Sequence, residues 1–337
     1  MQNYITLCQF ETKGQHMDYL FLVIGLALLL LGAEFLVDSS VAIAKRAKIS
    51  SFIIGLTIVG MGTSAPELIV SLSSSLSGHG DVAVGNIVGS NICNIFLILG
   101  LSAAITPFVI QKEIVKRDIP FGIFAVILLF VLANDSLIFC AKESGLSRME
   151  GIVLLVLFVA YMAFTITKSL KNRGKMEEEE AESKLSGKPI PLLLLIAVAS
   201  LAGLIGGGNL FLSSAENLAR AWGVSEAVIA ITVVAVGTSL PELITSIIAA
   251  LKDNSELALG NVIGSNVFNA LFILGIASSA HPISIQGVRM EDFAVMIFAT
   301  LCTLAVAFSF RKYFFTRGEG IFFLVCYVGY TAYLVMR

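Results

Sequence analysis

Two short stretches of the chain carry the residues that can do chemistry. The sequence GTSAPELIV contains Thr63 and Glu67, and the sequence GTSLPELIT contains Thr238 and Glu242 at the same places. Both stretches interrupt long apolar runs. Carboxylate and hydroxyl oxygens are hard ligands of the kind that Na⁺ and Ca²⁺ take in proteins. The two glutamates therefore predict a cation site, whose two negative charges one Ca²⁺ or two Na⁺ would balance.

A proline precedes each glutamate. Taken as one helix, residues 55–77 place the threonine and the glutamate of the first stretch on one face, because they are four positions apart. Pro66 has no backbone N–H, so the carbonyl of Gly62 loses its usual helical partner, and a bound cation can replace that partner. Pro241 does the same in the second stretch. We expect each proline to open its helix so that backbone oxygens lie beside a carboxylate.

The helix after each stretch adds a polar stripe. Amide and hydroxyl side chains recur there every four positions, which puts them on one face. They are Asn86, Ser90 and Asn94 in the first copy, and Asn261, Ser265 and Asn269 in the second. Cation binding and interhelical hydrogen bonding both stay open for four asparagines: Asn86, Asn91, Asn261 and Asn266. Glycines allow two backbones to approach closely at four more positions: Gly85, Gly89, Gly260 and Gly264.

The ligand types narrow the choice of ion. No histidine occurs in residues 62–75 and 85–94 or in the matching residues 237–250 and 260–269. The one cysteine in these stretches, Cys93, corresponds to Phe268 in the second copy. Both observations argue against a zinc or copper site. Ca²⁺ accepts six to eight oxygens at flexible angles, whereas Mg²⁺ needs strict octahedral geometry. Na⁺ and Ca²⁺ are therefore favoured, and ions that share one pair of carboxylates would compete.

Composition places the chain in a membrane. It is 57% hydrophobic and 14% charged, with a mean hydropathy of +0.90, whereas soluble domains average about 25% charged residues. The lipid bilayer is thus its expected surroundings, and no basic tract suggests a nucleic acid partner. The five cysteines lack paired spacing and are interpreted as apolar residues. A removable signal peptide is not expected, and Met17 is a candidate start because the apolar pattern begins directly after it.

The apolar runs divide the chain into two halves. We predict an all-α polytopic membrane protein with ten transmembrane helices, at 19–43, 51–77, 82–106, 119–139, 147–168, 190–214, 225–250, 256–279, 292–310 and 320–336. The charged segment 169–189 separates residues 1–168, with motifs at 55–100, from residues 190–337, with motifs at 230–275. At a constant offset of 175, positions 62–100 and 237–275 are identical at 19 of 39 places. The chain is an internal duplication.

An odd number of spans inserts the second copy upside down, so the halves are expected to form two inverted five-helix repeats. With the N-terminus outside, 16 of the 22 Lys and Arg fall in cytoplasmic loops, as the positive-inside rule favours. Both termini are therefore expected outside and the linker 169–189 inside. Inverted repeats that meet at a midplane site are a transporter plan.

Two further acidic residues lie on one face of the first span. Glu34 and Asp38 correspond to Asn209 and Ser213 in the second half. This asymmetry argues against a role as central ligands. We expect them at a cytoplasmic helix end or an access path.

The motifs identify a resemblance. GTSAPELIVSLSSS with GNIVGSNICN, repeated as GTSLPELITSIIAA with GNVIGSNVFN, closely resembles the α-repeats of the sodium/calcium exchanger family, within the calcium/cation antiporter superfamily. The resemblance covers essentially the whole chain and implies the ten-span inverted fold. The linker of about 20 residues resembles the compact prokaryotic type, because it has no room for a regulatory calcium-binding domain.

The resemblance also implies roles for single residues. The Ca²⁺ site would use Thr63, Glu67, Thr238 and Glu242. One Na⁺ site would use Ser90 with the Gly60 carbonyl, and the other would use Ser265 with the Ala235 carbonyl. Ser64 and Ser239 would support these sites, and Asn94 and Asn269 would lie at the centre. The spans 19–43 and 190–214 would slide across the rest. Some prokaryotic members carry aspartate at the position of Asn269, so the number of Na⁺ ions per cycle stays open here.

These observations predict a secondary antiporter, not an enzyme, that exchanges Na⁺ for Ca²⁺ by alternating access in a prokaryotic inner membrane. No cofactor and no obligate protein partner are inferred. A proton-coupled Ca²⁺ exchanger of the same superfamily is the alternative. The flanking hydroxyl and carbonyl oxygens favour Na⁺, since a proton needs only the carboxylates. A cation channel is disfavoured by the internal pairing of inverted halves, and an intramembrane enzyme by the lack of a Ser–His pair, an Asp dyad or a His cluster.

Overall fold

The computed structural model of the chain describes residues 2–134, 144–171, 183–224, 235–285, 287–309 and 311–336, with side chains from His16 onward. Helices make up most of it, because the long apolar runs satisfy their backbone hydrogen bonds internally. The elements of the first half are α1 (Gln2–Ala47), α2 (Ser51–Ile54), the π-helical turn η1 (Gly55–Val59), α3 (Gly60–Thr63), α4 (Ala65–Leu76), α5 (Gly80–Cys93), η2 (Asn94–Leu99), α6 (Gly100–Ile105), β1 (Phe108–Val109), η3 (Ile114–Asp118), α7 (Ile119–Ala133), β2 (Gly145–Leu146) and α9 (Arg148–Lys171).

The second half repeats this order of elements. It contains α10 (Ile190–Ala221), α12 (Ala235–Gly237), α13 (Leu240–Leu251), α14 (Ser255–Val267), η5 (Phe268–Ile273), α15 (Leu274–Ala280), β3 (Ile283–Ser284), α16 (Met290–Val306), β4 (Phe314–Phe315) and α17 (Arg317–Met336). Residues 225–234, within the expected seventh span, and most of the linker 169–189 lie outside the described residues.

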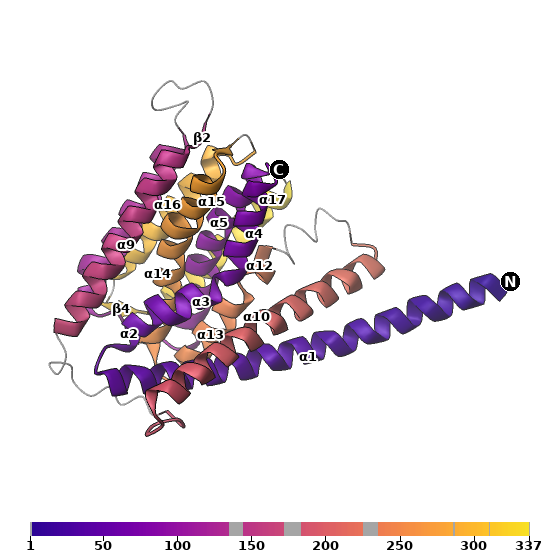
Figure 1. Cartoon of the computed structure of the whole chain (residues 1–337), viewed down its shortest axis with the longest axis horizontal. Helices are drawn as coiled ribbons and strands as arrows, with labels where there is room; N and C mark the ends of the chain where they lie inside the picture. The colour runs from indigo at the N-terminus through magenta and orange to yellow at the C-terminus, as the bar shows by residue number, and fades with distance from the viewer. Residues whose placement is uncertain are drawn as a thin grey trace.

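The helices α1 and α10 lie side by side at an angle to the upright bundle (Figure 1). Their backbones meet closely at glycines. A Cβ added to Gly25 would lie 2.8 Å from the carbonyl oxygen of Gly207, and one added to Gly32 would lie 3.0 Å from that of Ser200. The two contacts are equivalent in the internal repeat. Adding 175 takes Gly25 to the position of Ser200 and Gly32 to the position of Gly207. Small residues thus hold the two helices together as an antiparallel pair, as is typical of membrane helices.

The centre of the molecule is formed by α5 with η2 and by α14 with η5. Most of their residues are buried, and the large core cluster extends from them to α7, α9, α16 and α17. In contrast, α9 and α17 expose many large apolar side chains outward, among them Val156, Val159, Val325 and Val328. A protein in water would cover such residues, so this outer surface suits contact with lipid.

Two small antiparallel sheets relate the halves of the chain. Phe108 of β1 lies opposite Phe315 of β4, and Gly145 of β2 lies opposite Ser284 of β3. The offset of 175 takes Phe108 of β1 to Ile283 in β3. In the same way, β4 directly precedes the fifth helix of its half, α17, as β2 directly precedes α9. Exchanging the halves therefore exchanges the two sheets.

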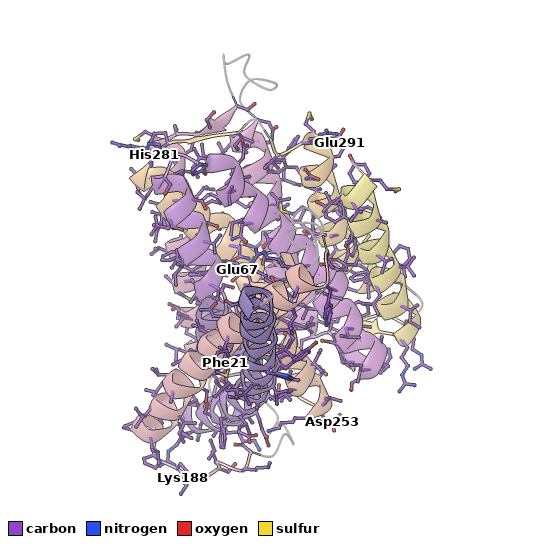
Figure 2. All side chains as sticks on the ribbon, turned by 90° about the vertical axis from the view of Figure 1, so that its right-hand side faces the viewer. Phe21, Glu67, Lys188, Asp253, His281 and Glu291 are labelled. Carbon is purple, nitrogen blue, oxygen red and sulfur yellow. The ribbon has the colours of Figure 1, made fainter. Side chains whose placement is uncertain are left out.

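Loops gather at two opposite ends. At one end, Arg46 donates to the carbonyl oxygens of Gly187 and Lys188, and Asn254 donates to Ser51. At the other, Ser75 donates to the carbonyl oxygen of His281. Figure 2 shows Lys188 and Asp253 at the lower end, His281 and Glu291 at the upper end, and Glu67 between them.

Among the described residues, six helices are long and apolar enough to cross a membrane, or seven if the bent pair Ser51–Thr63 and Ala65–Leu76 is one span. Ten were expected. The expected spans 119–139 and 225–250 overlap residues that the structure does not describe, and α16 has 17 residues against the 18 that such a helix needs. The count of ten remains a prediction.

Candidate cation site

Each motif contains a break in its helix. The first break lies at Ser64 (φ −79°, ψ 12°), where α3 and α4 meet at an angle of 47°, and the second lies at Ser239 (φ −89°, ψ 8°). The sequence suggested a single helix over 55–77 that opens at Pro66. The proline instead stands in the first turn of the new helix α4, where its missing N–H costs nothing. The bend therefore comes two residues earlier than expected.

Glu67 and Glu242 lie in the first turns of α4 and α13 and are fully buried. The positive end of a helix dipole favours an anion there. Each carboxylate accepts a hydrogen bond from the serine at the break of the other motif. Ser64 Oγ donates to Glu242 Oε1 at 2.8 Å, and Ser239 Oγ donates to Glu67 Oε1 at 3.2 Å. The structure thus brings the two motifs together at mid-molecule, with each half of the chain supporting the other's glutamate.

Four buried oxygens at this place have no hydrogen-bond partner among the described residues. They are Glu67 Oε2, Glu242 Oε2, Asn94 Oδ1 and Asn269 Oδ1, in two pairs that the offset of 175 relates. Leaving one buried polar atom unsatisfied costs about 1–3 kcal/mol. Unsatisfied acceptors on the residues of both motifs, two of them on carboxylates, are groups that a bound cation can satisfy.

The hydroxyl groups around the carboxylates are paired differently from the sequence expectation. The Gly60 carbonyl was expected with Ser90, but it accepts a hydrogen bond from Ser265 Oγ at 3.1 Å. Ser90 Oγ instead lies 3.2 Å from Glu67 Oε1 and 3.0 Å from Ser239 Oγ. The reason is that α14 packs against η1 and α3, so the Gly60 carbonyl faces the second half of the chain.

The close approach of α14 to the first motif depends on glycines. A Cβ added to Gly264 would lie 2.5 Å from the carbonyl oxygen of Leu56, and one added to Gly260 would clash with that of Phe52. This confirms the expected use of these two glycines. The corresponding neighbours of Gly85 and Gly89 would fall within 225–234, outside the described residues.

The threonines and Ala235 have less direct positions. Thr63 is buried, and its hydroxyl donates to Asn261 Oδ1 at 3.2 Å. It also interacts with the carboxylate of Glu242, the glutamate of the other motif. Thr238 is half-buried one residue before the break at Ser239. Ala235 begins α12, and its side chain is outside the described part.

Asn86 and Asn261 each join two neighbouring helices by hydrogen bonds. Asn86 Nδ2 donates to the Glu67 carbonyl oxygen at 3.4 Å and to Ser71 at 3.0 Å. Asn261 Nδ2 donates to the Glu242 carbonyl oxygen at 3.2 Å and to Ser246 at 2.8 Å. Of the two roles left open for these residues, the structure favours interhelical hydrogen bonding. They hold the backbone that carries each carboxylate.

Asn94 and Asn269 lie in the π-helical turns η2 and η5. A π-helical turn adds a residue to the local helix and often marks a functional site. Both side chains are fully buried. The sequence contained their spacing but no signal for the widened turns.

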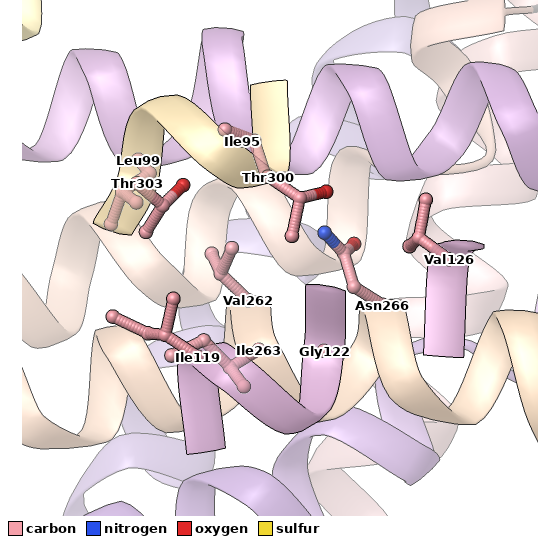
Figure 3. Close-up of a pocket in the computed structure, with 10 residues that line it drawn as sticks. All are labelled: Ile95, Leu99, Ile119, Gly122, Val126, Val262, Ile263, Asn266, Thr300 and Thr303. Carbon is pink, nitrogen blue, oxygen red and sulfur yellow. The ribbon is translucent and has the colours of Figure 1, made fainter. Parts of the chain in front are cut away.

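A cavity of about 30 Å³ lies beside Asn266, lined mainly by apolar side chains such as Ile95, Val126 and Val262 (Figure 3). The hydroxyls of Thr300 and Thr303, which also line it, donate to carbonyls of their own helix. Neither glutamate lines this cavity, and its lining does not suit a cation. Among the described residues, no group of three or more His, Cys, Asp or Glu comes together. Within the described part of the chain, the carboxylates of Glu67 and Glu242 supply the negative charge of the site.

Glu34 and Asp38 form ion pairs at the lower end of the molecule. Lys252 Nζ lies 2.7 Å from Asp38 Oδ1, and Lys184 Nζ lies 2.7 Å from Glu34 Oε1. The hydrogen bond and the charge of Glu34 raise the pKa of Lys184. Sequence reasoning placed the two acids at a helix end but missed Lys252, which is 214 positions from Asp38. Nothing in the spacing pointed to it.

Comparisons with known proteins agree on one family. The profile of the family described as "Sodium/calcium exchanger protein" matches residues 17–167 and 192–336. The putative antiporter CaxA of Alkalimonas amylolytica is 37% identical over 318 residues, which cover 92% of this chain and 96% of CaxA. The sodium/calcium exchanger MaX1 of Methanosarcina acetivorans is 30% identical over 348 residues, which cover 94% of this chain and 98% of MaX1.

A solved structure gives the same result for the fold. The sodium-calcium exchanger NCX_Mj, soaked with Na⁺ and Ca²⁺, matches with a TM-score of 0.79 at 32% sequence identity. The match covers 94% of this chain and 98% of NCX_Mj. NCX_Mj is a compact prokaryotic exchanger, and the named relatives are transporters rather than enzymes.

Proposed function

Because this chain belongs to the sodium/calcium exchanger family and is an integral membrane protein, we propose that it is a secondary antiporter that exchanges Na⁺ for Ca²⁺ by alternating access. The two ions would compete at a midplane site built on Glu67 and Glu242. One observation carries the proposal: each buried carboxylate has one oxygen held by a serine of the other motif and one oxygen without a partner.

The unpartnered oxygens suit Ca²⁺. The second oxygens of Glu67 and Glu242, with the amide oxygens of Asn94 and Asn269, supply four hard ligands. Ca²⁺ needs six to eight, so the hydroxyls of Thr63 and Thr238 are proposed to complete its shell, together with water. The pair of carboxylates balances the charge of one Ca²⁺.

Two groups of hydroxyls flank the carboxylates and suit Na⁺. One group is Ser265 with the Gly60 carbonyl and with Ser64, which reaches Glu242. The other is Ser90 with Ser239, and both reach Glu67; we place the Ala235 carbonyl with this group because the offset of 175 relates it to that of Gly60. Since each Na⁺ site shares a carboxylate with the Ca²⁺ site, occupancy by one ion excludes the other.

We propose ten crossings in two inverted five-helix repeats, 1–168 and 190–337, joined by the linker 169–189. The two small sheets support this plan, because each pairs one strand from each half: β1 pairs with β4, and β3 pairs with β2. So do two similar pairs at the start of the fourth helix of each half. Tyr161 donates to Asp118 at 2.8 Å, and Tyr330 donates to Asp292 at 3.1 Å.

The orientation is proposed from the loop charges. Lys45 and Arg46, in the last turn of α1, lie at the same end of the molecule as Lys188 of the linker. We place this end inside a prokaryotic inner membrane, with both termini outside. Single cysteines replacing Lys188 and His281 would test it. The expected result is that an impermeant thiol reagent labels position 281 from outside and position 188 only after permeabilisation. The reverse pattern would overturn the orientation.

The moving part is proposed to be the pair α1 and α10. The side chain of Leu201 would lie 2.6 Å from a Cβ added to Gly62, and that of Leu212 covers Gly237. The leucines of α10 therefore rest on both motifs where a side chain is missing. A surface without side chains lets one helix slide over another. The two glycines, Gly62 and Gly237, belong to the motifs that carry the glutamates of the site.

The direct test is radioactive Ca²⁺ uptake into proteoliposomes that hold the purified protein. One set is loaded with Na⁺, and a matched set is loaded with K⁺ and given a pH gradient. Uptake that requires internal Na⁺ and is lost in the Glu242→Gln variant is expected. Uptake driven by the pH gradient alone would instead assign the protein to the proton-coupled exchangers, with the same two glutamates at the site.

A further inference from the structure

Four buried asparagines form a hydrogen-bonded network near the two glutamates, with Asn91 and Asn266 in its middle and Asn269 and Asn94 at its two ends. Asn91 and Asn266 face each other across α5 and α14: Asn91 Nδ2 donates to the Asn266 carbonyl oxygen at 3.3 Å, and Asn266 Nδ2 donates to the Asn91 carbonyl oxygen at 3.4 Å. Their side-chain oxygens then accept from the other two members. Asn269 Nδ2 donates to Asn91 Oδ1 at 3.1 Å, and Asn94 Nδ2 donates to Asn266 Oδ1 at 3.0 Å.

The backbone carbonyls of Asn91 and Asn266 decide the orientation of every amide in this network. A backbone carbonyl only accepts, so Asn91 and Asn266 must turn their NH₂ groups toward it and their oxygens toward the outer pair. Asn94 and Asn269 must in turn offer their NH₂ groups to those oxygens. Their own oxygens take no part in the network, and these are the two buried amide oxygens without a partner among the described residues.

We propose that Asn91 and Asn266 are positioning residues of the cation site: they hold the amides of Asn94 and Asn269 by their NH₂ groups, so that the two amide oxygens stay free to bind a cation. Each acts on the central asparagine of the opposite half, Asn91 on Asn269 and Asn266 on Asn94. The inference rests on the proposed function of the central site, which it deepens.

The orientation matters because an amide has two chemically opposite ends. Asn269 Nδ2 lies 3.5 Å from Ser90 Oγ, which itself lies 3.2 Å from Glu67 Oε1, so the amide is one hydroxyl away from the carboxylate. Without Asn91, the NH₂ group of Asn269 gains more by turning toward a carboxylate, since hydrogen bonds to charged groups are stronger than those between neutral groups. An NH₂ group in that place repels a cation and occupies a ligand position.

The test uses the difference between asparagine and aspartate. A carboxylate presents oxygen at both ends, so an aspartate at the central position needs no orientation. Asn91→Leu and Asn266→Leu are made alone and in combination with Asn269→Asp and Asn94→Asp. Both leucine variants lose the same reciprocal contact between α5 and α14, so each serves as the matched control for the other. Asn91→Ala and Asn266→Ala replace them where leucine prevents folding.

Two measurements are made on each purified variant. One is the Ca²⁺ concentration that gives half-maximal Na⁺-dependent uptake in proteoliposomes. The other is the rise in the melting temperature of the detergent-solubilised protein on addition of Ca²⁺, which reports binding without transport. Asn91→Leu and Asn266→Leu alone are each expected to raise the half-maximal concentration about tenfold or more.

The expected rescue is specific to the pairs. Asn269→Asp should remove the effect of Asn91→Leu but leave that of Asn266→Leu, and Asn94→Asp should do the opposite. The inference would be overturned if Asn91→Leu and Asn266→Leu each raised the half-maximal Ca²⁺ concentration equally in the Asn269→Asp and Asn94→Asp backgrounds. Asn91 and Asn266 would then have a structural role alone. A wild-type protein without Na⁺-dependent uptake, whose melting temperature does not respond to Ca²⁺, would instead contradict the proposed function itself.

Discussion

Ser64 and Glu242 lie 178 positions apart in the chain, and the serine hydroxyl donates a hydrogen bond of 2.8 Å to the buried carboxylate. Ser239 and Glu67 repeat the contact with the halves exchanged. Each carboxylate therefore depends on the break in the opposite motif. A movement of one motif relative to the other changes the environment of both glutamates at once.

Removing these serines is expected to weaken ion binding without unfolding the protein. A hydrogen bond to a charged group contributes about 1.5–3 kcal/mol, so Ser64→Ala or Ser239→Ala should raise the half-maximal Na⁺ concentration for exchange about tenfold or more. Ser73→Ala is the control, because Ser73 lies exposed on α4, the helix that follows the break at Ser64, and donates to the carbonyl of Val70. Na⁺-dependent Ca²⁺ uptake measures all three variants. An equal response of Ser73→Ala and Ser64→Ala would count against the assignment.

Neutralising either glutamate should abolish exchange and leave the fold intact. Glu67→Gln and Glu242→Gln keep the shape of the side chain and remove one of two like charges that are buried close together. The melting temperature without ions should therefore not fall, while its rise on addition of Ca²⁺ should disappear. Glu113→Gln, at an exposed position, serves as the control. Near-normal Ca²⁺ flux in either site variant would refute the site.

The ion pair of Asp38 and Lys252 joins α1 to the end of α13, and its two partners differ in exposure. The Asp38 side chain is 5% exposed and that of Lys252 is 26% exposed. Lys252→Met leaves a buried charge unpaired, whereas Asp38→Asn leaves a lysine that can reach solvent. We expect a loss of about 1–3 kcal/mol for Lys252→Met, less than for a fully buried pair, and a smaller loss for Asp38→Asn.

Thermal unfolding of the two single variants and of the double variant measures this difference. The double variant should be more stable than Lys252→Met alone, since no unpaired charge remains. Glu34, which pairs with Lys184 and lies 3.9 Å from Lys252, has a side chain that is 37% exposed. Glu34→Gln should therefore change stability by at most about 1 kcal/mol. Equal losses for Lys252→Met and Asp38→Asn would show that the burial of Asp38 does not decide the energetics.

The crossing of α1 and α10 gives a sharp comparison between two adjacent glycines. A Cβ added to Gly207 would lie 2.7 Å from Leu28 Cβ and 2.9 Å from the Gly25 carbonyl oxygen, whereas one added to Gly206 has nothing within 4 Å. Overpacking of this kind costs about 1–3 kcal/mol. Gly207→Ala should therefore lower the melting temperature and the transport rate.

Gly206→Ala should leave both unchanged or raise stability by up to about 1 kcal/mol, because alanine has the higher helix propensity. The same substitution on the same helix thus separates the helix contact from a general effect on α10. If Gly207→Ala behaves like Gly206→Ala, the two helices do not depend on their close approach.

The residues that carry the chemistry could be read from the sequence. Glu67 and Glu242 interrupt apolar runs, where a charge is costly, and the constant offset of 175 repeats the hydroxyls and amides around them. Hydrophobic runs of sufficient length and local spacing are properties of short segments. For that reason the helical class, the duplication and most candidate ligands needed no information about contacts.

The tertiary structure decided which partner each of these residues meets. The sequence paired the Gly60 carbonyl with Ser90, but the packing of α14 against η1 and α3 gives it to Ser265. It contained no sign that Ser64 would reach Glu242, that Lys252 would reach Asp38, or that four asparagines would join in one hydrogen-bonded network. Each of these contacts joins residues more than 170 positions apart, and the crossing of packed helices sets them. No periodicity in a single segment encodes such a crossing.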